Sequence, residues 1–418
     1  MEANVTKRSH FENILFTFVF FSILLPPGAQ YLLLLVVLIR TIVCKQGSPW
    51  KKVVEFGGKR FVYGLTLNLA TLGALAVVWV IREPMLRSDV VSDYAHVMAK
   101  QFLWPLIMVW TLVCAHKRGW RLDNGLVFLV SLLVVHLSYV LAQRYFGIDW
   151  VHGLDAVLPG NRFAYGVYRV SGFMSHPLNL AYNLMLFCLM AYFFAFRMGP
   201  SKNSRLWALV FGLASLTLVV TVSRFATLLT IAVIFLWEFK RIREFKKVAL
   251  GALAAIVLIL AVEQSTIRRI SELSLEPSRM AETMPRIGFW KIHWQMFTDH
   301  PLLGVGLHNR VSASLDYYNR AGYTEKEDKY RAHNIFLQTL ADSGIVGFAG
   351  LIAFLLGLCG LGYHGAKNST RLFLVVFLAT LACGFVDNIL RDSEFVFALF
   401  YVLIISKLSL LDEGETRV

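Results

Sequence analysis

Long apolar runs, many close to the ~20 residues that a helix needs to cross a bilayer, alternate with short polar segments along most of the chain. The runs lack the alternation of polar and apolar positions that marks the strands of a transmembrane barrel. The pattern therefore predicts an all-α polytopic membrane protein with about twelve transmembrane helices. We expect two short spans in the run 14–43, which Pro26-Pro27-Gly28 breaks into a hairpin, and further spans at about 61–81, 96–114, 125–141, 177–196, 206–222, 225–239, 248–261, 335–361, 372–385 and 395–411.

One long segment, 263–334, separates two of these apolar runs. We therefore expect three parts: residues 1–262 with spans one to nine, a large and partly helical loop at 263–334, and residues 335–418 with spans ten to twelve and the C-terminus. Polar and aromatic motifs gather in the loop, so the chemistry is expected there and at polar residues that the spans bring beside it.

The charge of the chain reports its orientation in a membrane. Lys and Arg number 41 against 27 Asp and Glu, a net charge of +14, yet only 16% of the residues are charged, below the ~25% of soluble domains. The basic residues gather in short loops, at 45–60, 117–121, 197–205, 240–247 and 364–371. A cytoplasmic N-terminus places all five loops inside, as the positive-inside rule requires. Nucleic-acid binding is not indicated, because no aromatic-interleaved basic domain is present.

The same orientation brings four polar segments to the outer face: 144–175, Ser223-Arg224, 263–334 and Asp387–Asp392. These segments contain no Asp-x-Asp or paired carboxylates of the kind that holds a divalent metal, so neither a metal nor another cofactor is expected. The chain also lacks a cytoplasmic domain for a nucleotide-sugar, which favours a donor carried by a lipid.

His333 is the candidate general base. It stands where the long loop becomes an apolar helix, and we expect it to share a helix face with Leu337 and Leu340. The partial positive charge of a helix start disfavours the imidazolium and keeps the ring available as a base. The alternative is an interfacial histidine that makes a structural hydrogen bond.

Three arginines are candidates for binding an anion. Arg224 interrupts two spans at the outer boundary, Arg286 follows Pro285 at the start of a short amphipathic segment, and Arg169 precedes a Ser-His-Pro sequence. The forked guanidinium suits the paired oxygens of a pyrophosphate. For Arg224, the alternative is a side chain that reaches to lipid headgroups.

Four further features leave alternatives open. Asp387 lies at the outer end of a span, where it orients His333 or an arginine, or pairs with Arg391. Gly304-Val305-Gly306 is expected to form a tight turn and not a nucleotide loop, because no strand and no Walker lysine accompany it. His308 is a second histidine candidate without the helix-start setting, and its role stays open. The outer aromatics Trp290, Trp294, Tyr317 and Tyr318 stack on sugars or, more conservatively, anchor the loop at the membrane interface.

Several sequence motifs, taken in their order along the chain, resemble those of the O-antigen ligase/polymerase superfamily. Its members are bacterial membrane proteins that transfer glycans from undecaprenyl diphosphate. The matching pieces are Arg169-x-x-Gly172-x-x-x-His176-Pro177, Ser223-Arg224, Arg286-x-x-x-Trp290, His300-Pro301-Leu302-x-Gly304-Val305-Gly306, and Ala332-His333-Asn334-x-x-Leu337 with Gly344-x-x-Gly347. The twelve-span plan with one large periplasmic loop is also similar to this superfamily and to the GT-C class of membrane glycosyltransferases.

The resemblance implies roles for particular residues. It implies that His333, Arg224 and Arg286 are essential, and that Asp387 is the acidic residue of the last outer turn. Asn334 and Asp387 are taken as orienting residues, and Arg169 as a further contact to the donor diphosphate. The implied substrates are a glycan linked to undecaprenyl diphosphate and a lipid A–core acceptor, at the periplasmic face of the bacterial inner membrane.

Within the superfamily, a ligase, a polymerase and a protein O-oligosaccharyltransferase are the alternatives. No long extension follows Leu411, which favours ligase or polymerase, and the set Arg224, Arg286 and Asp387 favours the ligase. A transporter is the alternative from another class. It would need ionisable residues near mid-span and an internal repeat, whereas the polar residues of this chain cluster at one face.

Overall fold

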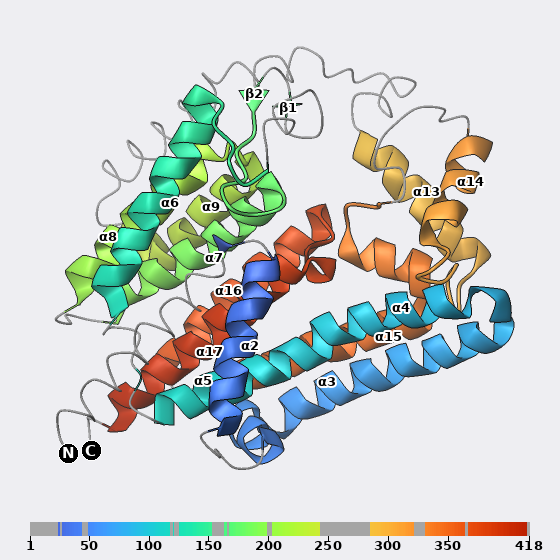
Figure 1. Ribbon diagram of the computed structural model, residues 1–418, viewed down its shortest axis with the longest axis horizontal. Coiled ribbons are helices and arrows are strands. Elements are labelled where there is room, and N and C mark those ends of the chain that lie inside the picture. The colour runs from blue at the N-terminus through green and yellow to red at the C-terminus, as the bar shows by residue number, and fades with distance from the viewer. Residues whose placement is uncertain are drawn as a thin grey trace. The chain divides into compact units, whose positions relative to one another are not determined.

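The computed structural model describes residues 24–25, 27–43, 49–117, 120, 125–152, 163–164, 167–198, 203–242, 285–321, 331–363 and 367–415. The chain forms two compact units (Figure 1). The first consists of residues 1–37 and 118–275, and the second of residues 38–117 and 276–418. In the described part the chain is helical apart from one two-stranded pairing.

The helices between residues 126 and 242 of the first unit form a bundle, accompanied by one short antiparallel pair of strands (Figure 1). The elements of this unit are the start of α2 (Pro27–Val43), α6 (Leu126–Phe146), β1 (Phe163–Ala164), β2 (Val167–Tyr168), α7 (Pro177–Phe196), α8 (Ser204–Val220) and α9 (Arg224–Ile242). The strands are antiparallel, with Phe163 opposite Tyr168. Helix α7 is the centre of the bundle, because it is buried along nearly its whole length and packs against α8 and α9.

The second unit contains the remaining helices. They are α3 (Pro49–Arg82), η2 (Pro84–Leu86), α4 (Arg87–Met98), η3 (Ala99–Leu103), α5 (Trp104–Lys117), α13 (Pro285–Asp299), α14 (Arg310–Arg320), α15 (Ile335–Tyr363), α16 (Lys367–Val386), η6 (Ile389–Arg391) and α17 (Ser393–Glu415). Helices α4 and α5 form one rod, joined through the π-helical turn η3.

Five described helices are long and apolar enough to cross a membrane: Val54–Arg82, Pro84–Lys117, Leu126–Phe146, Pro177–Phe196 and Ile335–Gly362. Shorter apolar helices occupy Gln30–Ile42, Ser204–Val220 and Thr370–Val386. Each of these helices overlaps a span that the apolar pattern predicts, so the prediction of an all-α, multi-pass protein is confirmed. The expected span at 248–261 and the first arm of the 14–43 hairpin up to residue 23 lie outside the described residues, and the total of twelve stays a prediction.

Helices α3 and α15 pack along a line of glycines, and Figure 1 shows them side by side. A Cβ atom added at Gly64 would lie 2.4 Å from Gly357 Cα, and one added at Gly360 would lie 2.8 Å from the backbone nitrogen of Phe61. Small residues let membrane helices approach this closely, because dispersion between backbones replaces the hydrophobic drive that is absent in lipid. The contact holds α15, and therefore the segment that precedes it, against α3.

Helix α15 is broken at Gly344, which has φ 62°. In an unbroken helix the N–H groups of Ile345 and Val346 would donate to the carbonyls of Ala341 and Asp342. Here they donate instead to Pro301 O at 2.9 Å and Leu302 O at 3.3 Å. The freed carbonyls of Ala341 and Asp342 accept from Val305 N at 3.0 Å and Gly306 N at 2.9 Å.

Residues 301–306 therefore replace the hydrogen bonds that the break removes. An unpaired backbone group inside a membrane protein costs several kcal/mol, so a broken helix needs such a partner. The close packing of residues 301–306 on α15 requires a glycine in each of the two segments. A Cβ at Gly304 would lie 2.4 Å from the carbonyl carbon of Asp342, and one at Gly344 would lie 2.2 Å from Leu302 O. The tight turn expected at Gly304-Val305-Gly306 is present, with φ 65° and 91° at the two glycines.

Candidate functional site

His333 lies directly before α15 in an unusual backbone conformation. Its φ is 48°, and in the described part of the chain only Val222 shares a positive φ among the non-glycine residues. Asn334 caps the helix, because its Oδ1 accepts from Phe336 N at 3.0 Å and Leu337 N at 3.1 Å. The expectation that His333 shares a helix face with Leu337 and Leu340 is therefore wrong. Because Asn334 caps the helix, α15 begins after His333, and the histidine is not part of a helix face.

The His333 ring faces Asp387, the first residue after α16. Nδ1 of His333 lies 3.4 Å from Asp387 Oδ1, and about one sixth of each side chain is exposed. The second contact of this carboxylate is Asn388 N, which donates to Oδ1 at 2.8 Å. Of the roles left open for Asp387, the structure shows the contact to the histidine. Arg391 pairs instead with Asp342, in α15.

The pKa of Asp387 is lowered from its ordinary value. Burial alone would raise it, but the hydrogen bond and charge of His333, the N–H of Asn388 and the charge of Arg286 together outweigh burial. Arg286 is thus close enough to act on this carboxylate. It is exposed, in the first turn of α13. An imidazole just before α15, a carboxylate just after α16 and a guanidinium in the first turn of α13 therefore lie near one another in the second unit.

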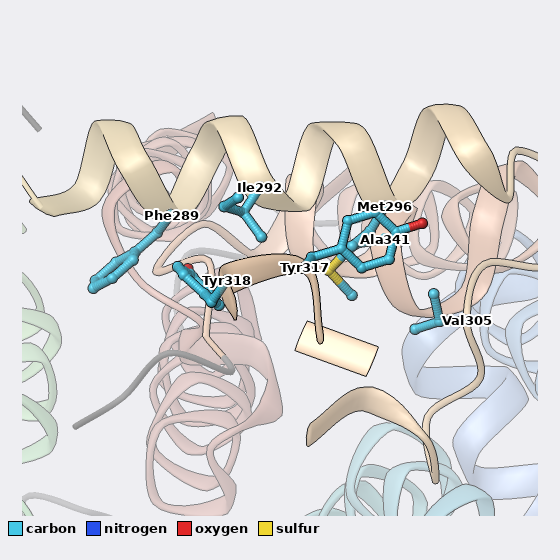
Figure 2. Packing of buried hydrophobic residues seen from close by; sticks show 7 residues of the cluster. All are labelled: Phe289, Ile292, Met296, Val305, Tyr317, Tyr318 and Ala341. Atoms are coloured by element: carbon cyan, nitrogen blue, oxygen red, sulfur yellow. The ribbon is translucent and has the colours of Figure 1, made fainter. Parts of the chain in front are cut away.

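Helix α13 is held against His333 by a small apolar core. Phe289, Ile292 and Met296 lie on one side of α13, and Figure 2 shows them packed with Tyr317 and Tyr318 of α14. Val305 and Ala341 complete the cluster, so the segment that docks on α15 belongs to the same core. The Phe289 ring also packs on the His333 ring, with centroids 5.8 Å apart. This core fixes the first turn of α13 beside the histidine.

The structure separates the four aromatics of this region into two groups. Tyr317 and Tyr318 are buried, with 8% and 1% of their surface exposed, so neither is free to stack on a sugar or lie in a headgroup layer. Tyr317 donates to Asp299 Oδ2 at 2.7 Å. Trp290 and Trp294 are exposed by 37% and 54% on the opposite side of α13. They follow Arg286 at successive four-residue steps and thus continue its face of the helix.

His308 has a different setting. Its side chain is 1% exposed, Nε2 lies 2.9 Å from Glu83 Oε2, and the ring packs edge-on against Trp79 at 5.2 Å. The neighbouring Leu307 belongs to an apolar cluster with residues of α3 and α4. His308 thus connects the chain directly after residues 301–306 to Glu83, at the end of α3.

Arg224 lies in the first unit, as the first residue of α9. The turn before it contains Val222, whose φ of 58° is strained for a β-branched residue. Ser223 N donates to Thr221 Oγ1 at 3.3 Å and Ser223 O accepts from Thr227 N at 3.0 Å, which stabilises the turn. A positive φ is rare outside glycine and is often retained at functional sites. Val222 directly precedes the Ser223-Arg224 motif, and His333 belongs to the Ala332-His333-Asn334 motif.

Arg169 also lies in the first unit, on a segment that is tightly fixed to α6. Gln143 of α6 donates to Gly172 O at 3.2 Å and accepts from Gly172 N at 2.8 Å. His152 bonds Asp149 Oδ1 at 2.8 Å and Met174 O at 2.8 Å, and His176 caps α7 by accepting from Leu178 N at 3.2 Å. Arg169 itself is half-buried.

The candidate residues thus fall into two groups. His333, Asn334, Asp387 and Arg286 lie near one another in the second unit, whereas Arg224, at the start of α9, and Arg169, directly after β2, belong to the first. Sequence reasoning missed Phe289, Gln338 and Asp342. The last two were detectable, because a glutamine and an aspartate four residues apart lie on one face of an otherwise apolar span.

Among the residues that the structure describes, no group of three or more His, Cys, Asp or Glu side chains is placed to hold a metal ion.

Comparison with known families gives one finding. Residues 208–352 match the family model described as O-antigen ligase. The match spans Arg224, Arg286, His333 and Asn334, and it ends before Asp387. The resemblance to the O-antigen ligase superfamily is therefore confirmed. Members of this family are glycosyltransferase-like enzymes of lipopolysaccharide biosynthesis. No match was found among curated proteins.

Proposed function

We propose, from the match of residues 208–352 to the O-antigen ligase family, that this protein is an O-antigen ligase. It transfers a glycan from undecaprenyl diphosphate to lipid A–core, at the periplasmic face of the bacterial inner membrane. The observation that carries the proposal is the contact of His333 with Asp387 beside Arg286. A base, a group that orients it and a cation for a phosphorylated leaving group are the parts that such a transfer needs.

His333 acts as the general base. With its Nδ1–H directed at Asp387, the Nε2 lone pair is available to take the proton of an acceptor hydroxyl. The hydroxyl oxygen attacks C1 of the donor sugar as the bond from C1 to the diphosphate oxygen breaks. The electron pair of that bond leaves with undecaprenyl diphosphate, and the proton remains on His333. Asp387 then stabilises the imidazolium, as a carboxylate partner of a catalytic histidine does. Displacement in one step inverts the anomeric centre.

Arg286, Arg224 and Arg169 bind the donor diphosphate in this proposal. The leaving group gains negative charge as the bond to C1 breaks, and a guanidinium stabilises that charge more in the transition state than in the ground state. Arg286 is exposed in the first turn of α13, and its charge already acts on Asp387. The reaction is proposed to proceed without a metal, because the arginines supply the positive charge.

The exposed face of α13 extends this site to the glycan. Trp290 and Trp294 follow Arg286 along the helix with a rise of ~6 Å per step. A donor whose diphosphate contacts Arg286 can therefore lay its sugars over the two indoles. The competing role is an anchor at the membrane interface, where tryptophan is common. Loss of glycan transfer in Trp290→Ala without loss of membrane insertion supports the sugar contact, and a change in insertion alone supports the anchor.

The proposed topology places 263–334 in the periplasm between spans one to nine and spans ten to twelve. Ser312, which is exposed on α14, tests it. A cysteine introduced at Ser312 should react with a membrane-impermeant thiol reagent from the periplasmic side. A cysteine at Ser201, which lies outside the described residues in the segment 197–205 expected on the cytoplasmic side, should not react. The opposite labelling pattern would move the whole site to the cytoplasm.

The test of the function is glycan transfer by the purified protein. Undecaprenyl diphosphate glycan is offered with lipid A–core, with a second carrier-linked repeat unit and with a serine-containing peptide, each in EDTA. Transfer to lipid A–core alone supports the ligase. Transfer to the repeat unit identifies a polymerase and transfer to the peptide a protein O-oligosaccharyltransferase. Activity that is lost in EDTA and restored by Mg²⁺ contradicts the proposed chemistry.

A further inference from the structure

A buried polar network lies behind the His333–Asp387 pair. Gln338 and Asp342, one turn apart in α15, are 1% and 0% exposed. Gln338 Nε2 donates to both carboxylate oxygens of Asp342, at 3.0 and 3.1 Å. Asp342 also forms an ion pair with Arg391 of η6. Burying such groups in an apolar helix is costly, and an apolar substitute of the same shape is often as stable. The network therefore calls for a role beyond stability.

The position of its remaining bonds indicates that role. Gln338 Oε1 accepts from Ala332 N at 2.6 Å and from Asn388 Nδ2 at 3.1 Å. Ala332 directly precedes His333, and Asn388 directly follows Asp387. One oxygen atom thus joins the two chain segments that carry the proposed base and its carboxylate. Lys100 Nζ reinforces the second segment by donating to Arg391 O at 3.0 Å.

The orientation of the Gln338 amide is fixed from both ends. Its oxygen faces two groups that only donate, and its nitrogen faces a carboxylate that only accepts while ionised. A flipped amide would place N–H against N–H and oxygen against oxygen. Asp342 therefore determines which atom of Gln338 faces Ala332 and Asn388.

We propose that Gln338, oriented by Asp342, is a positioning residue that sets the separation of His333 and Asp387. This inference rests on the proposed function, because it takes His333 as the base. Gln338 touches neither the substrate nor the reacting atoms in this account. It acts through the two backbone segments that it joins. A misplacement of ~1 Å in such a pair can cost ~100-fold in rate.

The test compares Gln338→Leu with Gln101→Leu in the purified full-length protein. Gln101 is a matched control, because it is also a buried amide of the second unit, and it accepts from Asn68 Nδ2 at 3.0 Å. Gln338→Leu should lower kcat by about 10- to 100-fold, with the KM for the donor changed less than ~3-fold. The acid limb of its pH–rate profile should move to lower pH, because a more distant carboxylate stabilises an imidazolium less. Gln101→Leu should lower the thermal midpoint without changing kcat or the acid limb.

A rescue variant separates hydrogen bonding from bulk. Gln338→Glu combined with Asp342→Asn exchanges carboxylate and amide, and it keeps an acceptor facing Ala332 and Asn388. It should recover kcat to within ~5-fold of the wild type. If Gln338→Leu does not fold, Asn388→Ala carries the test and should lower kcat by about 3- to 10-fold at unchanged donor KM.

Two outcomes overturn the inference: a wild-type kcat and pH profile in Gln338→Leu, or in Asn388→Ala where that variant carries the test, and an equal loss of kcat in Gln101→Leu. His333→Ala is measured in the same series. If it is inactive while Gln338→Leu is normal, only the positioning role fails. If it is fully active, the proposed function fails.

Discussion

Two histidines of the second unit each lie beside a carboxylate, yet their surroundings differ. His308 is 1% exposed, is packed against Trp79 and bonds Glu83 at 2.9 Å. His333 is 17% exposed, has a left-handed backbone and lies 3.4 Å from Asp387, near the charge of Arg286. The first arrangement joins two parts of the fold. The second leaves part of the His333 side chain exposed, beside a carboxylate on which the charge of Arg286 acts.

A histidine–carboxylate pair is therefore not by itself evidence of a functional site. The His308 ring is buried, with Glu83 at one nitrogen and the Trp79 ring packed edge-on against it. The His333 pair is partly exposed, and His333 has a positive φ, which is uncommon outside glycine. Substitutions at His333, Arg286, Asp387 and His308 test this difference.

His333→Ala should lower the turnover of glycan transfer by about 10²- to 10⁴-fold, because the general base is removed. Binding of the undecaprenyl diphosphate donor should stay near the wild-type value, since the arginines remain. The measurements are single-turnover transfer and donor affinity on the same preparation. A variant that binds donor poorly but transfers at the normal rate would assign His333 to binding.

Arg286→Lys should lower the rate by about 10²- to 10³-fold, because lysine keeps the charge but not the forked contact to a diphosphate. Lys291, exposed on the same helix, provides a matched control. Lys291→Ala should leave the rate within ~3-fold of the wild type. Equal losses in both variants would show that the general charge of α13 matters and not the guanidinium of Arg286.

Asp387 makes stability depend on pH in a defined direction. Its folded-state pKa is lowered, so its ionised form stabilises the folded protein. This stabilisation is complete above the unfolded value of ~3.9 and is lost as pH falls through the lower folded value. Asp387→Asn should therefore reduce the thermal midpoint at pH 7 and have progressively less effect below about pH 4. A constant difference between the two proteins across this range would contradict the ion-pair origin of the shift.

His308→Ala should have the smallest effect on transfer, within ~3-fold of the wild type, because its ring is closed off by Glu83 and Trp79. It should instead lower the free energy of unfolding by roughly 1–3 kcal/mol, the range for loss of a buried hydrogen-bonding group. Thermal denaturation in detergent gives the second quantity. Unchanged stability together with lost transfer would reverse the comparison.

The helices of this fold were predictable, because apolar runs of membrane length leave little freedom in how they fold. The predicted spans at 177–196 and 335–361 match α7 and α15 closely. The tight turn at Gly304 and Gly306 was predictable from residue type as well. Its purpose was not, because the break at Gly344 lies far along the chain and only the fold brings the two segments together.

The site was predictable in its residue types and not in its geometry. His333 was expected on a helix face with Leu337 and Leu340, but the Asn334 cap starts the helix after it, and the residue types do not reveal its φ of 48°. The partner of Asp387 was undecided among several, because Arg391 is nearer in sequence. The structure shows that Asp342 pairs with that arginine and leaves Asp387 beside the histidine.

The most direct measurement compares His333→Gln with His308→Ala in single-turnover transfer from undecaprenyl diphosphate glycan to lipid A–core. Glutamine retains hydrogen bonding but cannot act as a base, so His333→Gln should be slower than the wild type by at least ~10²-fold. His308→Ala should transfer at nearly the wild-type rate. An active His333→Gln together with an inactive His308→Ala would contradict the account and move the acid–base role to His308.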